Sequence, residues 1–117
     1  MAKSRIVVDV MGGDDAPGVV IEGIKAALDR DKDLSIVAVG TPEALTALAD
    51  VDPSRCERVI ATEVIAMDEH PANAVRTKKD SSIVVGCKAV REGKADGFYS
   101  AGSTGAVLVG ATLAIGR

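Results

Sequence analysis

Residues 5–29 have the sequence RIVVDVMGGDDAPGVVIEGIKAALD, in which a β-branched run, a pair of glycines and an amphipathic segment follow one another. The run at residues 5–10 is typical of a buried strand, and residues 11–13 form a glycine turn after it. From Pro17 to Asp29 the apolar residues recur at helical spacing, with the proline in the first turn, where its missing N–H would have no partner. The segment therefore predicts a strand, a turn and a helix.

The same alternation continues along the chain. Further strands are predicted at residues 34–39, 57–61 and 95–100, and further helices at residues 42–50, 71–76, 83–91 and 106–115. The stretch from Thr62 to His70 is predicted to be irregular. Strands that alternate with helices favour a mostly parallel sheet with helices on both faces, so we expect an α/β fold of three layers.

The composition of the chain limits the classes of protein to which it can belong. A chain of 117 residues can form one modest core, because folding at this size buries roughly two-thirds of the unfolded surface. Its residues are 47% hydrophobic and 26% charged, which argues against disorder. Only Phe98 and Tyr99 are aromatic and the net charge is -3, so we expect no nucleic-acid partner.

The cysteines and the termini add little chemistry. Cys56 and Cys87 form no CxxC motif and the chain has one histidine, so no metal site is expected. Cys87 falls on an apolar helix face and is predicted to be a core residue.

The N-terminus lacks the features of a signal peptide, which makes a cytoplasmic protein the expectation. The uncharged stretch 97–116 contains turn residues and leaves about ten helical residues, too few to span a membrane.

A glycine-rich loop between the last strand and the last helix is the first candidate site. Ligands bind at such positions in open α/β sheets, and this loop matches no nucleotide-binding motif. Its glycines admit close approach, and its hydroxyls and helix N–H groups suit an anion. The alternative is an ordinary turn with a helix cap. The phosphate-binding candidates here are Ser100, Gly102, Ser103, Thr104 and Gly105.

A basic cluster before the helix at 83–91 is the second candidate. Residues 76–94 hold six Lys or Arg and two Asp or Glu, a local charge of +4. The cluster suits phosphate or an acidic protein, and the alternative is a solvated helix edge. Asp80, Ser81 and Ser82 are N-cap candidates for that helix.

The end of the first strand is the third candidate, with Asp9, Gly12, Gly13 and Asp14. These carboxylates would orient a basic residue, hold the glycine turn or meet a metal, and a purely structural role is equally open. His70 is a single loop histidine, either catalytic or an exposed bystander.

Four groups of residues together resemble the bacterial phosphate acyltransferases of the PlsX family. They are Asp9-Val-Met-Gly-Gly-Asp14, Glu63-Val-Ile-Ala-Met-Asp68-Glu69 with Pro71, Ala74-Val-Arg76 with Lys78-Lys-Asp-Ser-Ser82, and Ser100-Ala-Gly-Ser-Thr-Gly-Ala106. The motifs occur in the family's order and cover nearly the whole chain. Ser103 stands where the family usually has Asn.

The resemblance implies transfer of an acyl group from acyl carrier protein to orthophosphate, giving the acyl phosphate that begins phospholipid synthesis, without a cofactor. It also implies a Rossmann-like fold related to isocitrate and isopropylmalate dehydrogenases, a homodimer and peripheral membrane association. Family members continue beyond these motifs, so we expect residues 1–117 to form the N-terminal α/β portion of a longer acyltransferase, with an incomplete fold in this chain.

Under this hypothesis the loop from Ser100 to Gly105 cradles phosphate, Lys79 or Arg76 neutralises its charge, and Ser81 and Ser82 donate hydrogen bonds. The candidates for docking the acidic carrier protein are Arg76, Lys78, Lys88 and Arg91. Orthophosphate is itself a nucleophile, so no catalytic triad is required and no catalytic residue is assigned. The alternatives are a phosphotransacetylase-like enzyme that uses acetyl-coenzyme A, a non-catalytic phosphate-binding module and an inactive fragment.

Overall fold

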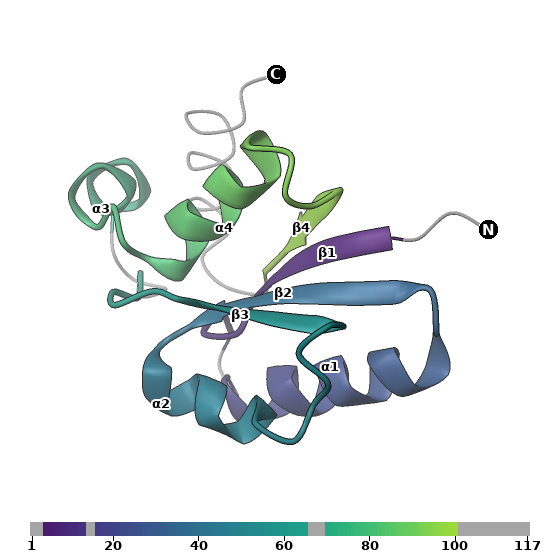
Figure 1. Ribbon diagram of the computed structural model, residues 1–117. Coiled ribbons are helices and arrows are strands. Elements are labelled where there is room, and N and C mark those ends of the chain that lie inside the picture. Colours follow the sequence, from purple (N-terminus) through teal and green to yellow (C-terminus); the bar gives the residue numbers. More distant parts are fainter. Residues whose placement is uncertain (1–3, 14–15, 66–69, 101–117) are drawn as a thin grey trace.

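The computed structural model describes residues 4–13, 16–65 and 70–100 (Figure 1). The strands in this part of the chain are β1 (Ser4–Asp9), β2 (Leu34–Gly40), β3 (Cys56–Ile60) and β4 (Gly97–Tyr99). They form one sheet in the order β3-β2-β1-β4, and all three pairings are parallel. The helices are α1 (Gly18–Arg30), α2 (Pro42–Leu45), α3 (Pro71–Thr77) and α4 (Ser82–Arg91). The predicted α/β class and parallel sheet are confirmed.

Several element boundaries differ from the prediction. The helix expected at residues 42–50 is the four-residue α2 followed by a 3-10 turn at Thr46–Leu48. The hydroxyl of Thr46 donates to the carbonyl of Glu43 at 2.6 Å, a local bond that competes with regular helix. β4 is shorter than predicted, β3 begins one residue earlier, and α1 begins at Gly18. The helix predicted at residues 106–115 lies outside the described residues.

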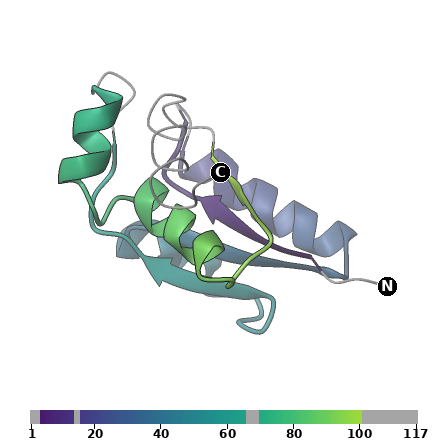
Figure 2. The ribbon, with the colours of Figure 1, turned by 90° about the horizontal axis from the view of Figure 1, so that it is seen from above.

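The helices form layers on both faces of the sheet. In Figure 1, α1 and α2 lie below the strands and α4 lies above them. Seen from above in Figure 2, α4 lies in front of the sheet and α1 behind it, while α3 lies beyond one end of α4. The predicted three-layer arrangement is therefore confirmed for the described residues.

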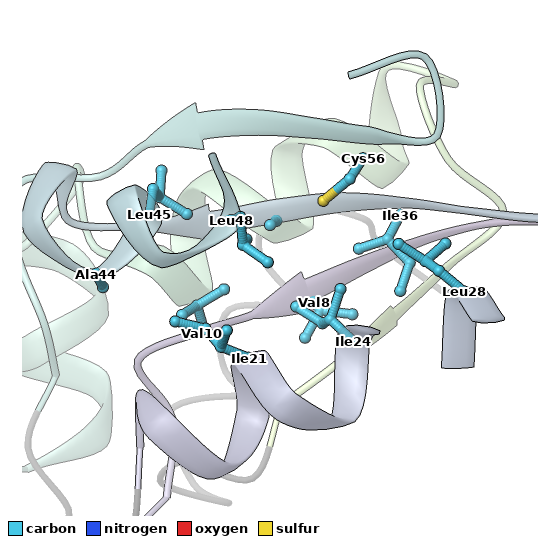
Figure 3. Packing of buried hydrophobic residues seen from close by; sticks show 11 residues of the cluster. Val8, Val10, Ile21, Ile24, Leu28, Ile36, Ala44, Leu45, Leu48 and Cys56 are labelled. Carbon is cyan, nitrogen blue, oxygen red and sulfur yellow. The ribbon is translucent and has the colours of Figure 1, made fainter. Parts of the chain in front are cut away.

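β1 is apolar on both faces because both are covered. Val8 and Val10 face α1 and pack with Ile21, Ile24 and other residues of one buried cluster (Figure 3). Val7 points to the opposite face, where it packs with Val37, Val39 and Ala89 of α4 in a second cluster. This alternation follows from the two-residue period of a strand, and it explains the continuous β-branched run in the sequence.

A third cluster joins α3 to α4. Ala74 and Val75 of α3 pack against Ile83 and Cys87 of α4. Cys87 is completely buried, which confirms the prediction that it is a core residue. None of the helices in the described ranges is long and apolar enough to cross a membrane.

The strand order contains a change of direction. From β1 the chain adds β2 and β3 on one side, and it then crosses back to add β4 on the other side of β1. In open α/β sheets such a switch point leaves a crevice outside the carboxyl ends of the two central strands, and ligands bind there. In this fold the switch point lies between β1 and β4, so Asp9 and Ser100 meet at its rim.

We expect alanine substitutions at two helical glycines to change the stability of the protein in opposite directions. A Cβ at Gly23 of α1 would meet nothing within 4 Å, whereas a Cβ at Gly86 of α4 would overlap the Phe98 ring and lie 3.2 Å from Val7 Cγ1. We expect Gly23→Ala to raise the free energy of unfolding by about 0.5–1 kcal/mol through helix propensity. We expect Gly86→Ala to lower it by about 1–3 kcal/mol through overpacking. Urea denaturation measures both, and equal stability of the two variants would contradict the close approach of α4 to the sheet.

Candidate functional site

A hydrogen bond between Asp9 and Ser100 links the ends of β1 and β4. The Ser100 hydroxyl donates to Asp9 Oδ2 at 2.8 Å, and the backbone N–H of Met11 donates to Asp9 Oδ1 at 3.0 Å. Asp9 is 1% exposed and is the one charged side chain buried in the described part of the chain. Both carboxylate oxygens have donors, which is the condition for keeping a carboxylate inside the protein.

Strand alternation places Asp9 on the same face as Val7, toward α4. Cys87 of α4 is close enough for the charge of Asp9 to act on it. Burial, with that charge as a smaller contribution, raises the pKa of the Cys87 thiol to about 11. Cys87 is therefore a neutral thiol near neutral pH and is not a nucleophile.

The glycine turn after β1 forms the next part of the rim. Gly13 has a φ of 107°, a conformation that favours glycine. Gly12 and Gly13 also border a groove of about 480 Å³ on the α1 face, which is lined mainly by apolar side chains. Val19 and Tyr99, which border the same groove, are 62% and 56% exposed. We call this surface the α1 groove.

The start of α4 is bound to the segment after β3. Ser81 is the N-cap of α4, where its Oγ accepts from the Val84 N–H at 3.3 Å. Ser82 donates its N–H to the carbonyl of Glu63 at 3.2 Å, and Ser81 and Ser82 are both buried. Lys78 Nζ donates to the carbonyl of Val64 at 2.9 Å. In the described structure these groups hold α4 against residues 63 and 64.

Asp80 completes this connection. Its Oδ2 accepts from the Thr62 hydroxyl at 2.5 Å and from the Thr62 N–H at 2.9 Å. These two bonds hold the pKa of the Asp80 carboxyl below its usual range, with a smaller contribution from the charge of Lys88. Of the three N-cap candidates, Ser81 is the cap of α4, and Asp80 binds Thr62 instead.

Lys79 lies beside the β3 edge of the sheet. It lines a groove of about 280 Å³ with Glu57 and Val59 of β3 and with Lys88 of α4. Ser100 follows β4, and β3 and β4 are the two outer strands. A hydrogen bond joins Asp9 to Ser100, and no hydrogen bond or ion pair joins Lys79 to either residue in the described part of the chain.

The remaining candidates fall into two groups. Arg76, Lys88 and Arg91 are exposed on α3 and α4. His70 is exposed and caps α3, where its Nδ1 accepts from the Asn73 N–H at 3.5 Å. No group of three or more metal-ligating side chains occurs among the described residues. The candidates Asp14, Gly102, Ser103, Thr104 and Gly105 lie outside the described residues.

Sequence reasoning named Asp9 and Ser100 separately and missed their contact. A signal was present, because Asp9 interrupts a β-branched run two positions after Val7, on a face predicted to be buried. A buried carboxylate needs hydrogen-bond donors, and the parallel strand beside β1 can supply one.

Comparison with known proteins identifies clear relatives. A family model described as "Fatty acid synthesis protein" matches residues 4–117. A phosphate acyltransferase of Limosilactobacillus fermentum is 48% identical over 113 residues, which are 97% of this chain and 32% of the relative. One from Desulfitobacterium hafniense is 47% identical over 115 residues, and one from Levilactobacillus brevis is 50% identical over 113 residues. The chain spans about a third of the length of these curated relatives.

The Asp80 connection predicts a pH-dependent loss of stability. The pKa of this carboxyl is lower in the folded protein, so its stabilising effect is present above the unfolded pKa and is lost as the pH falls through the folded pKa. We expect Asp80→Asn to lower the melting temperature above about pH 5 and to have little effect by about pH 2.

Glu22→Gln is the matched control, since the Glu22 side chain is exposed on α1. Thermal unfolding followed by circular dichroism across this pH range measures the difference. An Asp80→Asn effect that is the same at every pH would contradict the role of the ionised carboxylate.

Proposed function

The chain belongs to the fatty acid synthesis protein family, and from this membership we propose that it carries the phosphate-binding part of a phosphate acyltransferase. The observation that carries the proposal is the identity of 47–50% to phosphate acyltransferases over 97% of the chain. The reaction would transfer a fatty acyl group to orthophosphate and supply acyl phosphate to phospholipid synthesis. The proposed acyl donor is acyl carrier protein, which releases its thiol.

The proposed reaction requires the protein to position the phosphate more than to activate it as a nucleophile. An oxygen of hydrogen phosphate attacks the thioester carbonyl carbon, a C–O bond forms and the C–S bond breaks. The carrier leaves as a thiolate, which becomes the thiol by taking up the proton that the phosphate loses. Phosphate is already an anionic nucleophile near neutral pH, so the protein has to orient it, stabilise the oxyanion and exclude water. Among the described residues, Cys87 is a neutral thiol and His70 caps α3, so we assign neither of them as a nucleophile.

We place the phosphate at the switch point between β1 and β4. Support comes from the buried Asp9–Ser100 pair, the glycine turn at Gly12 and Gly13, and the general rule for ligands in open α/β sheets. The loop that begins at Ser100 would supply further donors through Gly102, Ser103, Thr104 and Gly105. In the described structure Lys79 lines the β3 side, and Ser81 and Ser82 are buried, so we give these three residues no direct phosphate contact.

The exposed basic side chains of α3 and α4 suit the carrier protein. Acyl carrier protein is acidic, and the stretch 76–94 has a charge of +4. Arg76, Lys88 and Arg91 are exposed, and Lys88 and Arg91 lie one turn apart on α4. We propose that these residues steer the carrier toward the carboxyl edge of the sheet, with Lys78 beside them.

Four broader features complete the proposal. The sheet would be the N-terminal α/β portion of a longer acyltransferase with an isocitrate dehydrogenase-like arrangement. The protein would act as a cytoplasmic homodimer with peripheral access to membrane, where the acyl phosphate is used. The parallel sheet supports the fold class, and the family model supports the link to fatty acid synthesis.

The activity is testable by thiol release. The purified protein, expressed from its complete reading frame, should release thiol from acyl carrier protein thioesters only when phosphate is present. Acetyl-coenzyme A should be a poor donor, because the proposed surface recognises the carrier. Phosphate-dependent release from acetyl-coenzyme A alone would favour a phosphotransacetylase, and saturable phosphate binding without release would favour a binding module.

The docking surface is testable by charge reversal. We expect Lys88→Glu with Arg91→Glu to raise the KM for the acyl carrier by about 10-fold or more and to reduce its salt dependence. The KM for phosphate should stay within about two-fold of wild type, since both side chains are exposed on α4 and neither is bonded to Asp9 or Ser100 in the described structure. Lys32→Glu, on the exposed turn between α1 and β2, is the matched control. Equal carrier KM values for the double variant and the control would reject the assignment.

A further inference from the structure

The α1 groove is an apolar hollow between helix α1 and the sheet. Its volume of about 480 Å³ lies within the range of about 300–1,000 Å³ that is usual for small-molecule sites. None of the described residues that line the groove carries a charge. Val19 on the helix side and Tyr99 on the strand side are both exposed, and apolar side chains exposed together mark binding surfaces. The lining therefore favours an apolar ligand.

The groove extends from the carboxyl edge of the sheet toward its amino edge. Gly12 and Gly13, which follow β1, line it at the carboxyl edge. Val8 and Ile36 line it further in, where both side chains point from the sheet toward α1 (Figure 3). Val8 pairs with Tyr99 in the sheet register, and Ile36 lies two positions nearer the amino edge. One end of the groove is thus at the edge where the proposed acyl transfer takes place.

The dimensions of the groove suit a narrow chain better than a helix. The α1 residues that line it fall between positions 19 and 27, a rise of about 12 Å along the helix. A volume of about 480 Å³ spread over that length leaves a mean cross-section of about 40 Å². A helix with its side chains is about 10 Å across, or roughly 80 Å² in section, so it would not enter the groove. An unbranched hydrocarbon chain is narrow enough to do so.

Gly23 keeps the middle of the groove open. It lines the groove halfway between positions 19 and 27, and a Cβ at this position would meet nothing within 4 Å. Glycine is unfavourable inside a helix, because it lowers helix stability relative to alanine. A larger side chain at this position would enlarge α1 into the space of the groove without meeting the backbone of a neighbouring element.

We propose that the α1 groove holds the hydrocarbon chain of the fatty acyl substrate, and that Gly23 determines the length of chain it accepts. The thioester carbonyl lies toward Gly12 and Gly13, and the methyl end points along α1 toward Ala27. The identity of the occupant rests on the proposed function, because that reaction transfers a fatty acyl group. The inference goes beyond that function by naming a surface for the chain and a residue that sets specificity.

Binding of free fatty acids tests the groove without phosphate or carrier protein. Isothermal titration calorimetry with octanoate, decanoate and dodecanoate, each below its micelle concentration, measures the dissociation constants for the protein expressed from its complete reading frame. Each added methylene should tighten binding by about two- to four-fold, the effect of burying one such group. Affinity that does not rise with chain length, or no binding of dodecanoate, would overturn the proposal.

Gly23→Leu should fill the groove while the protein stays folded. The new side chain has open space at its Cβ and leucine favours helix over glycine, so the melting temperature should not fall. We expect dodecanoate to bind this variant about 10-fold more weakly than wild type, the effect of leaving about two methylenes unburied. If another part of the polypeptide fills the groove instead, wild type binds no fatty acid and Gly23→Leu lowers the melting temperature. That result would overturn the proposal.

Gly18→Leu is the matched control. Gly18 is exposed on the same helix, also has open space at its Cβ, and does not line the groove. Its dodecanoate affinity should stay within about two-fold of wild type, because the substitution is separate from the binding surface. Equal effects of the two leucine variants on dodecanoate binding would overturn the assignment of Gly23.

Thiol release is scored separately with carrier thioesters of different chain length. Gly23→Leu should lower kcat/KM for the dodecanoyl donor relative to the hexanoyl donor by about 10-fold or more. A purely structural role of Gly23 would lower the rates with both donors equally, which would overturn the proposal. Chain-length-dependent fatty acid binding without phosphate-dependent release would reject the proposed function and leave the groove as a fatty-chain site. Release with an unchanged donor ratio in the folded Gly23→Leu protein would reject this inference alone.

Discussion

Residues 7–10, at the carboxyl end of β1, have no side that faces solvent, and the rest of the described structure depends on that constraint. The strand pairs with β2 and β4 at its edges and lies between α1 and α4 at its faces. The side chains of these four residues must therefore be apolar or fully hydrogen-bonded. Val7, Val8 and Val10 satisfy the first condition, and Asp9 satisfies the second through Ser100 and Met11.

The same constraint places polar chemistry at one end of the sheet. Parallel strands have their carboxyl ends on a common edge, and the crossing from β3 to β4 leaves the switch point beside β1. A carboxylate there would repel an anion if it were exposed. Burial and the hydrogen bonds from Ser100 and Met11 instead keep this carboxylate away from solvent.

The sequence allowed the layers of the fold to be predicted but not the contacts of the site. β-branched runs and helical spacing were sufficient for β1, β2, α1 and α4, because their periodicity records which faces are buried. The length of α2 was not predictable, since Thr46 ends it through a local hydrogen bond. Lys79 and Ser100 are predicted to share one phosphate site, because a basic cluster and a glycine-rich loop both suit an anion. Their placement at opposite outer strands, with Lys79 beside β3 and Ser100 after β4, depends on strand order, which long-range packing decides rather than local pattern.

We propose that phosphate binds at the crevice between β1 and β4. Backbone amide chemical shifts, followed by NMR during titration with inorganic phosphate, test this placement. We expect saturable shifts that are largest at Met11, Gly12, Gly13 and Ser100. Shifts that are largest at Arg76, Lys79 and Lys88, with none at the ends of β1 and β4, would contradict it.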